Sequence, residues 1–135
     1  GLRRILVLNG HGGNIAPLRG VWDQLQRQAG ALNLQFLSHW ELLTEDDARE
    51  LLRSGSRLPQ DLPGHAQEFE TAFALAAFPE NVRREMWTDQ PDPTPALATP
   101  ECGRAFLERI LDRVTAHLEA MLEGRINAEQ PGYFP

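Results

Sequence analysis

The chain has 135 residues, a formal net charge of −6 and 41% hydrophobic residues, which predicts one globular domain over residues 1–135. The negative charge and the lack of a basic run argue against nucleic acid or an anionic membrane as partner, and no apolar stretch reaches the roughly 18 residues that span a bilayer. Cys102 is the only cysteine, so an internal disulfide bond is excluded and a reducing compartment, the cytoplasm, is expected.

The first predicted element is a strand close to the start of the chain. Residues 5–8 (ILVL) form an unbroken apolar run, which is typical of a strand covered on both faces. The chain begins at Gly1, without a methionine, directly before this strand. This beginning favours an upstream part of the protein that the sequence does not include.

A glycine-rich loop, Asn9 to Asn14 (NGHGGN), follows the strand and leads into a predicted helix with Asn14 as N-cap and Gly30 at its end. Loops at the carboxyl ends of parallel strands are common ligand sites. Three interpretations of His11 remain open. It is an incidental exposed histidine, part of a phosphate loop, or a metal ligand. The phosphate loop is the weakest, because the segment fits neither GxGxxG nor GxxxxGK[ST].

The rest of the chain alternates between strand and helix patterns. A second strand is predicted over residues 34–38, then a helix capped by Thr44 and Asp47, a helix that ends at Pro79, and a weak third strand over residues 82–87. Residues 88–99 form a proline-rich loop, and a long amphipathic helix follows, with Thr99 as cap, Pro100 as first residue and Gly124 just past its end.

This order predicts an α/β fold with parallel crossovers. The predicted sheet is too small to cover four helices that each carry an apolar face, since parallel sheets are buried on both sides. We therefore expect further strands, supplied by an upstream segment or by another chain.

A second polar segment, Gly64 to Thr71 (GHAQEFET), lies at the start of the helix that ends before Pro79. If that helix includes the whole segment, His65 and Glu68 are three residues apart and share a face, whereas Glu70 points elsewhere. The alternative for either glutamate alone is a structural one, because the helix dipole favours carboxylates in the first turn.

Three segments together, NGHGGN, GHAQEFET and ATPECGRAFLERI, resemble the C-terminal half of the creatininase (creatinine amidohydrolase) family. The resemblance implies a three-layer α/β/α sandwich with a mainly parallel sheet, of which the N-terminal part is missing here. It also implies a metal-dependent hydrolase that cleaves cyclic or linear amide C–N bonds in small molecules with metal-activated water. The resemblance further implies two bound divalent ions, which would be Zn, Mn or Fe. It also implies that the protein forms a homo-oligomer.

The resemblance also assigns roles to residues. His11 would be a metal ligand, His65 the acid/base group, and Glu68 or Glu70 part of the metal shell. Creatininase has a glutamate where this chain has Gly13, so another carboxylate is needed; we favour Glu68, which shares the predicted helix face with His65. Glu70 would then support the neighbouring loop by accepting backbone N–H bonds, and the remaining supporting residues are Asn9, Gly10, Gly12, Gly13 and Asn14.

The family's other metal ligands come from the N-terminal half, so the chain by itself is expected to be inactive. The alternative function is a non-catalytic, truncated homologue that serves as a binding or assembly subunit. Two residues also differ from the usual motif HAGEFETS, namely Gln67 in place of glycine and Ala72 in place of serine. A side chain at position 67 is expected to affect the site if the backbone there needs a conformation reserved for glycine.

Overall fold

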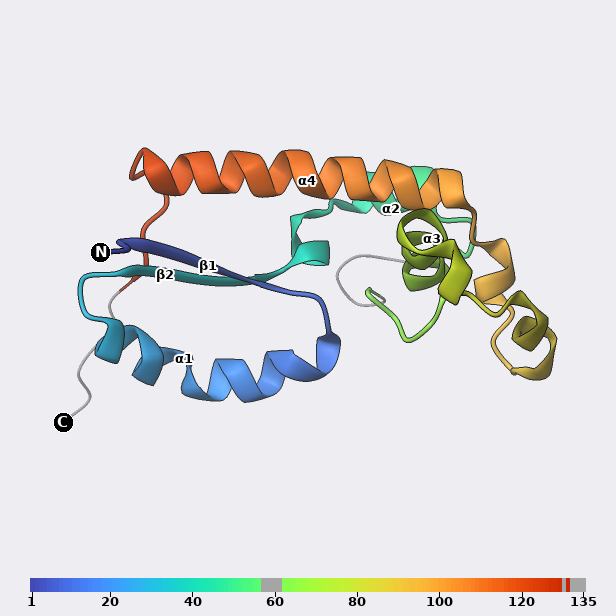
Figure 1. Ribbon diagram of the computed structural model, residues 1–135, viewed down its shortest axis with the longest axis horizontal. Helices are drawn as coiled ribbons and strands as arrows, with labels where there is room; N and C mark the ends of the chain where they lie inside the picture. Colours follow the sequence, from blue (N-terminus) through green and yellow to red (C-terminus); the bar gives the residue numbers. More distant parts are fainter. Residues whose placement is uncertain (57–61, 130, 132–135) are drawn as a thin grey trace. The chain divides into compact units, whose positions relative to one another are not determined.

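The computed structural model describes residues 1–56, 62–129 and 131 (Figure 1). The chain divides into two compact units, one made of residues 1–39 and 113–135 and the other of residues 40–112. The long helix α4, Pro100–Leu122, contributes its first part to the second unit and its last part to the first. The fold is of the mixed α/β kind expected from the sequence, with a small parallel sheet.

The first unit is built on two parallel strands, β1 (Arg4–Asn9) and β2 (Asn33–Ser38), joined by helix α1 (Ile15–Ala29). The register runs from Arg4 opposite Asn33 to Asn9 opposite Ser38, so both strands end at the same edge. Helix α1 lies on one face of the sheet and the last turns of α4 on the other (Figure 1). The side chain of Arg4 connects β1 to α4 by donating to the carbonyl oxygen of Met121, 2.7 Å away.

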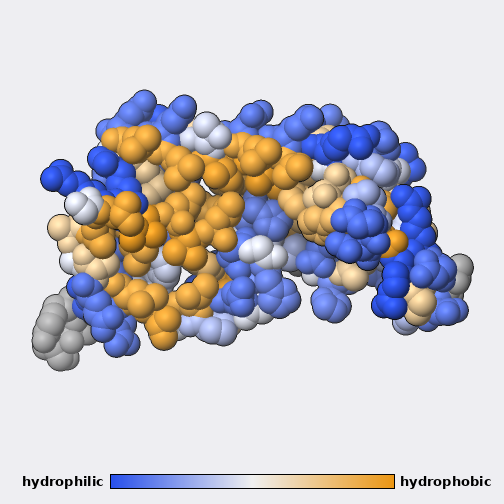
Figure 2. Space-filling view, viewed as in Figure 1, coloured by the Kyte–Doolittle hydropathy of each residue, from blue (hydrophilic) through white to orange (hydrophobic). Residues whose placement is uncertain are grey.

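Strand β1 is less buried than its sequence predicts. Val7 is 36% exposed and Leu8 46% exposed, although the apolar run at residues 5–8 predicted cover on both faces. Other exposed apolar side chains of this unit come from both helices: Val21, Leu25, Leu118 and Leu122. Figure 2 shows an apolar surface over β1, α1 and the end of α4, the elements that carry these residues. Among the described residues, β1 pairs with β2 alone.

The second unit contains helices α2 (Glu45–Leu51) and α3 (Glu68–Ala77), and the first part of α4. The weak strand predicted over residues 82–87 is wrong, because Arg84–Asp89 forms a 3-10 helix. Val82 and Trp87 pack against the buried residues Ala72 and Leu75 instead of pairing in a sheet. The proline-rich loop predicted over residues 88–99 contains a further short 3-10 helix, Thr94–Leu97.

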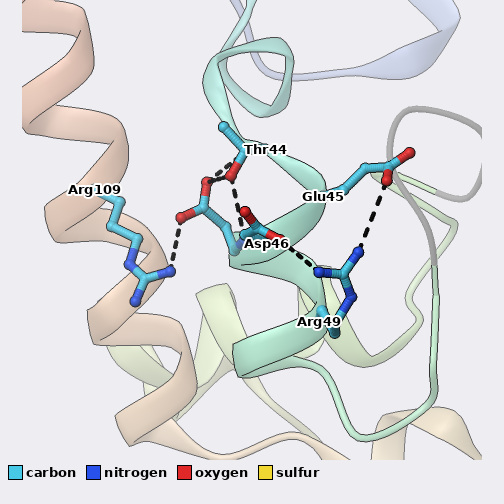
Figure 3. A network of polar contacts seen from close by, with 6 residues as sticks. Thr44, Glu45, Asp46, Arg49 and Arg109 are labelled. Carbon is cyan, nitrogen blue, oxygen red and sulfur yellow. Dashed lines mark hydrogen bonds and ion pairs between the residues drawn. The ribbon is translucent and has the colours of Figure 1, made fainter.

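Helix α2 begins with the reciprocal capping pattern that the sequence predicts. The Thr44 hydroxyl accepts the Asp47 N–H, and the Asp47 carboxylate accepts the Thr44 N–H at 2.6 Å. Asp47 is buried, and its other oxygen pairs with Arg109 of α4 at 2.7 Å. Figure 3 shows how this pair connects the start of α2 to α4, with Arg49 pairing to Glu45 and Asp46 on the exposed side.

The contact between α3 and α4 is apolar and very close. Phe69 and Phe106 are both buried, and their rings meet edge to face with centroids 4.9 Å apart. Gly103 of α4 lies against the backbone of α3, so that a Cβ atom at this position would be 1.9 Å from the carbonyl oxygen of Ala72. The two helices approach this closely only because residue 103 has no side chain.

Helix boundaries elsewhere follow the local signals. Gly30 ends α1 with a φ of +63°, and Phe78, directly before Pro79, caps the end of α3. Thr99 accepts the Cys102 N–H at the start of α4. In the part of the chain that the structure describes, no helix is both long and apolar enough to cross a membrane.

Candidate functional site

The loop from Asn9 to Asn14 is held by one buried side chain, Asn9. Its Oδ1 accepts the His11 N–H and a hydrogen from the Asn14 amide, each at 3.1 Å. Its Nδ2 donates to the His11 carbonyl oxygen at 2.9 Å and to Ser38 Oγ at 3.1 Å. Because Ser38 is the last residue of β2, Asn9 fixes the loop to the carboxyl ends of both strands.

His11 is exposed at the start of the 3-10 turn Gly12–Asn14. Its ring lies over Gly13, where a Cβ atom would be 2.7 Å from His11 Nε2. Neither ring nitrogen has a hydrogen-bond partner among the described residues. Gly13 therefore leaves space for an imidazole that remains available to a ligand. Asn14 occupies the N-cap position of α1 but makes no side-chain capping bond, and its Nδ2 donates to Asn9 Oδ1.

The second polar segment differs from its predicted geometry. Helix α3 begins at Glu68 with Gln67 as N-cap, so His65 lies outside the helix, exposed in the preceding turn. The expectation that His65 and Glu68 share a helix face is therefore wrong. The preference for Glu68 over Glu70 as a metal ligand rested on that shared face, and helix geometry no longer separates the two.

Glu68 is 2% exposed and holds the end of α2. Its Oε1 accepts the Arg53 N–H at 2.9 Å and its Oε2 accepts the Ser54 N–H at 2.7 Å. These two donors follow the last turn of α2, and backbone donors of this kind leave no signal in the sequence. Each carboxylate oxygen already accepts one backbone N–H and has one further lone pair with which it could bind a metal ion.

Glu70 makes a smaller loop contact, in which its Oε2 accepts the Ala66 N–H at 2.7 Å. The Thr71 hydroxyl donates to the Ala66 carbonyl oxygen at 3.1 Å, so both polar groups of Ala66 are satisfied from α3. Ala66 has a φ of +51°, a left-handed conformation that non-glycine residues seldom adopt. The segment next to His65 is thus held in a specific turn by the first residues of α3.

The two departures from the family motif fit without strain. Gln67 has φ −82° and ψ −172°, an extended conformation open to any residue, so the backbone at this position does not require glycine. Its side chain lies over Gly64. Ala72 is completely buried against Leu75 and Ala98, where a serine hydroxyl would need a hydrogen-bond partner.

The two polar segments belong to different units. The Asn9–Asn14 loop lies in the first, and His65, Glu68 and Glu70 lie in the second. Their assembly into one site stays a prediction. Among residues 1–56, 62–129 and 131, no group of three or more His, Cys, Asp or Glu side chains could hold a metal ion.

The protein-family comparison decides the relationship that these segments indicate. The family model described as creatininase, creatinine amidohydrolase, matches residues 1–118. The chain belongs to the creatinine amidohydrolase family. Hydrolases of the amidohydrolase type make up this family, and they are generally metal-dependent. No curated protein and no solved structure matched the chain.

Cys102 belongs to the first turn of α4 and lies near Glu68 of α3. Its thiol donates to the Leu51 carbonyl oxygen at 3.3 Å. Burial, and then the negative charge of Glu68, raise the pKa of the Cys102 thiol to about 11. The thiolate is the reactive form, so this cysteine is unreactive near neutral pH. The family resemblance gives it no role, and its environment does not favour nucleophilic chemistry.

We expect iodoacetamide to alkylate Cys102 in the folded chain about two orders of magnitude more slowly at pH 8 than in the urea-unfolded chain, where a thiol pKa near 8.5 applies. The folded rate should keep rising with pH toward 11, because the thiolate fraction grows until the pH reaches the raised pKa. The unfolded rate should level off above about pH 8.5. Equal rates and equal pH profiles in the two states would contradict the burial of this thiol.

Proposed function

We propose that this chain is part of a metal-dependent amidohydrolase that cleaves an amide C–N bond of a small molecule, with His11 as a metal ligand. The observation that carries the proposal is the exposed imidazole of His11, which has no partner among the described residues and lies on a strand-end loop fixed by Asn9. Family membership supports the reaction type. When bound, a pair of divalent ions (Zn, Mn or Fe) supplies a water of lowered pKa and polarises the amide carbonyl.

The described residues fit such ions only in part. His11 offers a free nitrogen donor, whereas both oxygens of Glu68 already accept backbone N–H groups. Glu70 has one oxygen without a partner among the described residues, and it therefore joins Glu68 as the candidate carboxylate. A catalytic ion usually has three protein ligands, so the proposal includes ligands from outside the described residues, and the 135 residues alone are expected to be inactive.

His65 is the proposed proton donor to the leaving nitrogen. It is exposed, and the turn that carries it is held by the bonds from Glu70 and Thr71 to Ala66. An imidazole can give or take a proton near neutral pH. In this scheme Glu70 also positions His65 through the turn, while the Asn9 side chain keeps the His11 loop open toward the end of the sheet.

A three-layer α/β/α sandwich and a homo-oligomer complete the proposal. Supporting it are the exposed Val7 and Leu8 on β1 and the exposed apolar residues of α1 and α4 that flank the same strand (Figure 2). Further strands beside β1 would bury this surface, whether they belong to the same polypeptide or to another chain. The alternative function, a non-catalytic assembly subunit in the cytoplasm, is favoured by the lack of a three-ligand group among the described residues.

The test is elemental analysis and creatinine or cyclic-amide hydrolysis with protein expressed from its complete coding sequence. We expect one or two equivalents of metal per chain. His11→Ala should weaken metal binding at least roughly a hundredfold, since even outer-shell changes cost 10- to 100-fold. His65→Ala should retain the metal and lower kcat by about 10²- to 10⁴-fold, the usual contribution of a general acid.

Two results would decide against this proposal. Protein without stoichiometric metal and without hydrolysis would favour the non-catalytic subunit. If His65→Ala lost metal and His11→Ala kept it, the two histidines would have the opposite roles, and the assignment made from the loops would be wrong.

A further inference from the structure

A cavity of about 360 Å³ lies within the second unit, next to the His65 turn. One wall is formed by Ala66, which directly follows His65, and by Glu70 of α3. The lining also includes Val82 and Trp87, from the segment that was wrongly predicted as a strand. The volume lies at the lower end of the range for small-molecule sites, roughly 300–1,000 Å³.

The apolar part of the cavity lining packs against the buried core of the second unit. Val82 and Trp87 line the cavity and also pack against the buried cluster of Ala72, Leu75 and Ala98. The Arg84 guanidinium lies 5.7 Å from the centre of the Trp87 ring and is not part of the cavity lining. The Trp87 indole thus adds an aromatic group to the apolar part of the lining.

Three polar side chains of the lining have no partner among the described residues. The side chains of Asn81, Arg83 and Gln90 make no hydrogen bond or ion pair with another described residue. Glu70 uses Oε2 for the Ala66 N–H and keeps Oε1 for another partner. The cavity thus combines a guanidinium, a carboxylate oxygen and two amides with an apolar wall, which is the composition of a site that orients a ligand by a few polar contacts.

We propose that this cavity binds the part of the substrate that does not react, and that the substrate class is an amide bearing a carboxylate and a flat apolar group. The inference rests on the proposed function, because it assumes that the reacting group is a substrate amide that lies next to His65. Arg83 pairs with the ligand carboxylate, the side-chain amides of Asn81 and Gln90 bond its amide group, and its planar group stacks on Trp87.

Arg83 is the residue that selects for the anion. The chain has a net charge of −6, so its overall field does not attract an anionic ligand. A guanidinium binds a carboxylate through two parallel hydrogen bonds, which a neutral amide of the same shape cannot reproduce. Affinity for a carboxylate over its neutral counterpart therefore depends on this side chain.

The test uses hippurate and its neutral counterpart hippuramide as probes, titrated into the isotope-labelled 135-residue chain in the presence of a chelator and followed by NMR. We expect shifts at the Trp87 indole and affinity for hippurate at least about fivefold above that for hippuramide. Arg83→Gln should weaken hippurate binding about tenfold, the loss expected of one charge-assisted pair. Arg104→Gln, an exposed arginine of the same unit that does not line the cavity, should change it less than about twofold.

Equal affinity for the two probes, equal effects of the two arginine substitutions, or no shift at Trp87 would overturn the inference. The titration needs neither metal nor turnover, so its failure is distinct from failure of the proposed function. Metal-loaded protein that hydrolyses creatinine but does not bind hippurate would overturn only the present inference. Hippurate binding through Arg83 in a protein that takes up no metal would support the cavity's selectivity and count against the hydrolytic proposal.

Discussion

Replacing Gly103 by alanine should lower the free energy of unfolding by about 3 kcal/mol, the upper part of the range for overpacking. The added Cβ atom would lie 1.9 Å from the Ala72 carbonyl oxygen and 2.9 Å from the Ala76 Cβ. The first neighbour is backbone, so the atom fits only if α3 and α4 move apart. That movement would open the contact between Phe69 and Phe106 as well. Urea unfolding followed by circular dichroism measures the change.

Gly20→Ala is the matched control for this substitution. Gly20 also lies inside a helix, α1, but a Cβ atom there would meet no atom of the described residues within 4 Å. Alanine is the better helix former, so we expect this variant to be more stable than the natural chain by up to about 1 kcal/mol. Equal effects of the two substitutions would show that the close approach of α3 and α4 is not present in solution.

Glu68→Gln should lower the free energy of unfolding by about 2–3 kcal/mol, although the two side chains have nearly the same shape. The carboxylate accepts the N–H groups of Arg53 and Ser54 with its two oxygens. An amide can accept only one of them, and its NH₂ group then faces the other donor in a buried position. The same urea unfolding experiment applies.

The control is Glu70→Gln, which affects one exposed hydrogen bond to Ala66, and the expected loss in the free energy of unfolding is below about 1 kcal/mol. A second measurement reports on the charge of Glu68 itself. This charge raises the pKa of Cys102 in addition to burial, so alkylation of Cys102 in Glu68→Gln should begin at lower pH than in the natural chain. An unchanged alkylation profile, together with unchanged stability, would contradict the structural role assigned to Glu68.

Local signals in the sequence predicted most helix boundaries correctly because their causes lie within a few residues. The Thr44–Asp47 capping pattern, the glycine at position 30 and the proline at position 79 all act on the turn next to them. The strand predicted over residues 82–87 failed for the opposite reason. A strand needs a neighbouring strand, and in the described structure Val82 and Trp87 find their apolar contacts on helices instead.

In the candidate site, too, features set by neighbouring residues could be predicted from the sequence, and features set by distant residues could not. The His11 loop and its glycines could be predicted, because the change from an apolar strand to a helical pattern brackets them. The partners of Glu68 could not, since they are backbone groups more than ten residues earlier in the chain. The cavity at Arg83 was also missed, because its lining comes from α3 and from a later segment whose positions depend on packing.

The amino-acid sequence by itself determined the family, the strand–loop–helix unit that carries His11, and the helix caps, because each of these rests on short-range patterns. The tertiary structure decided where α3 begins, which groups its two glutamates hold, and that Gly103 is needed for space. These features depend on contacts between residues distant in the chain, which no short-range pattern specifies. They are also the features that separate a buried structural carboxylate at position 68 from a partly available one at position 70.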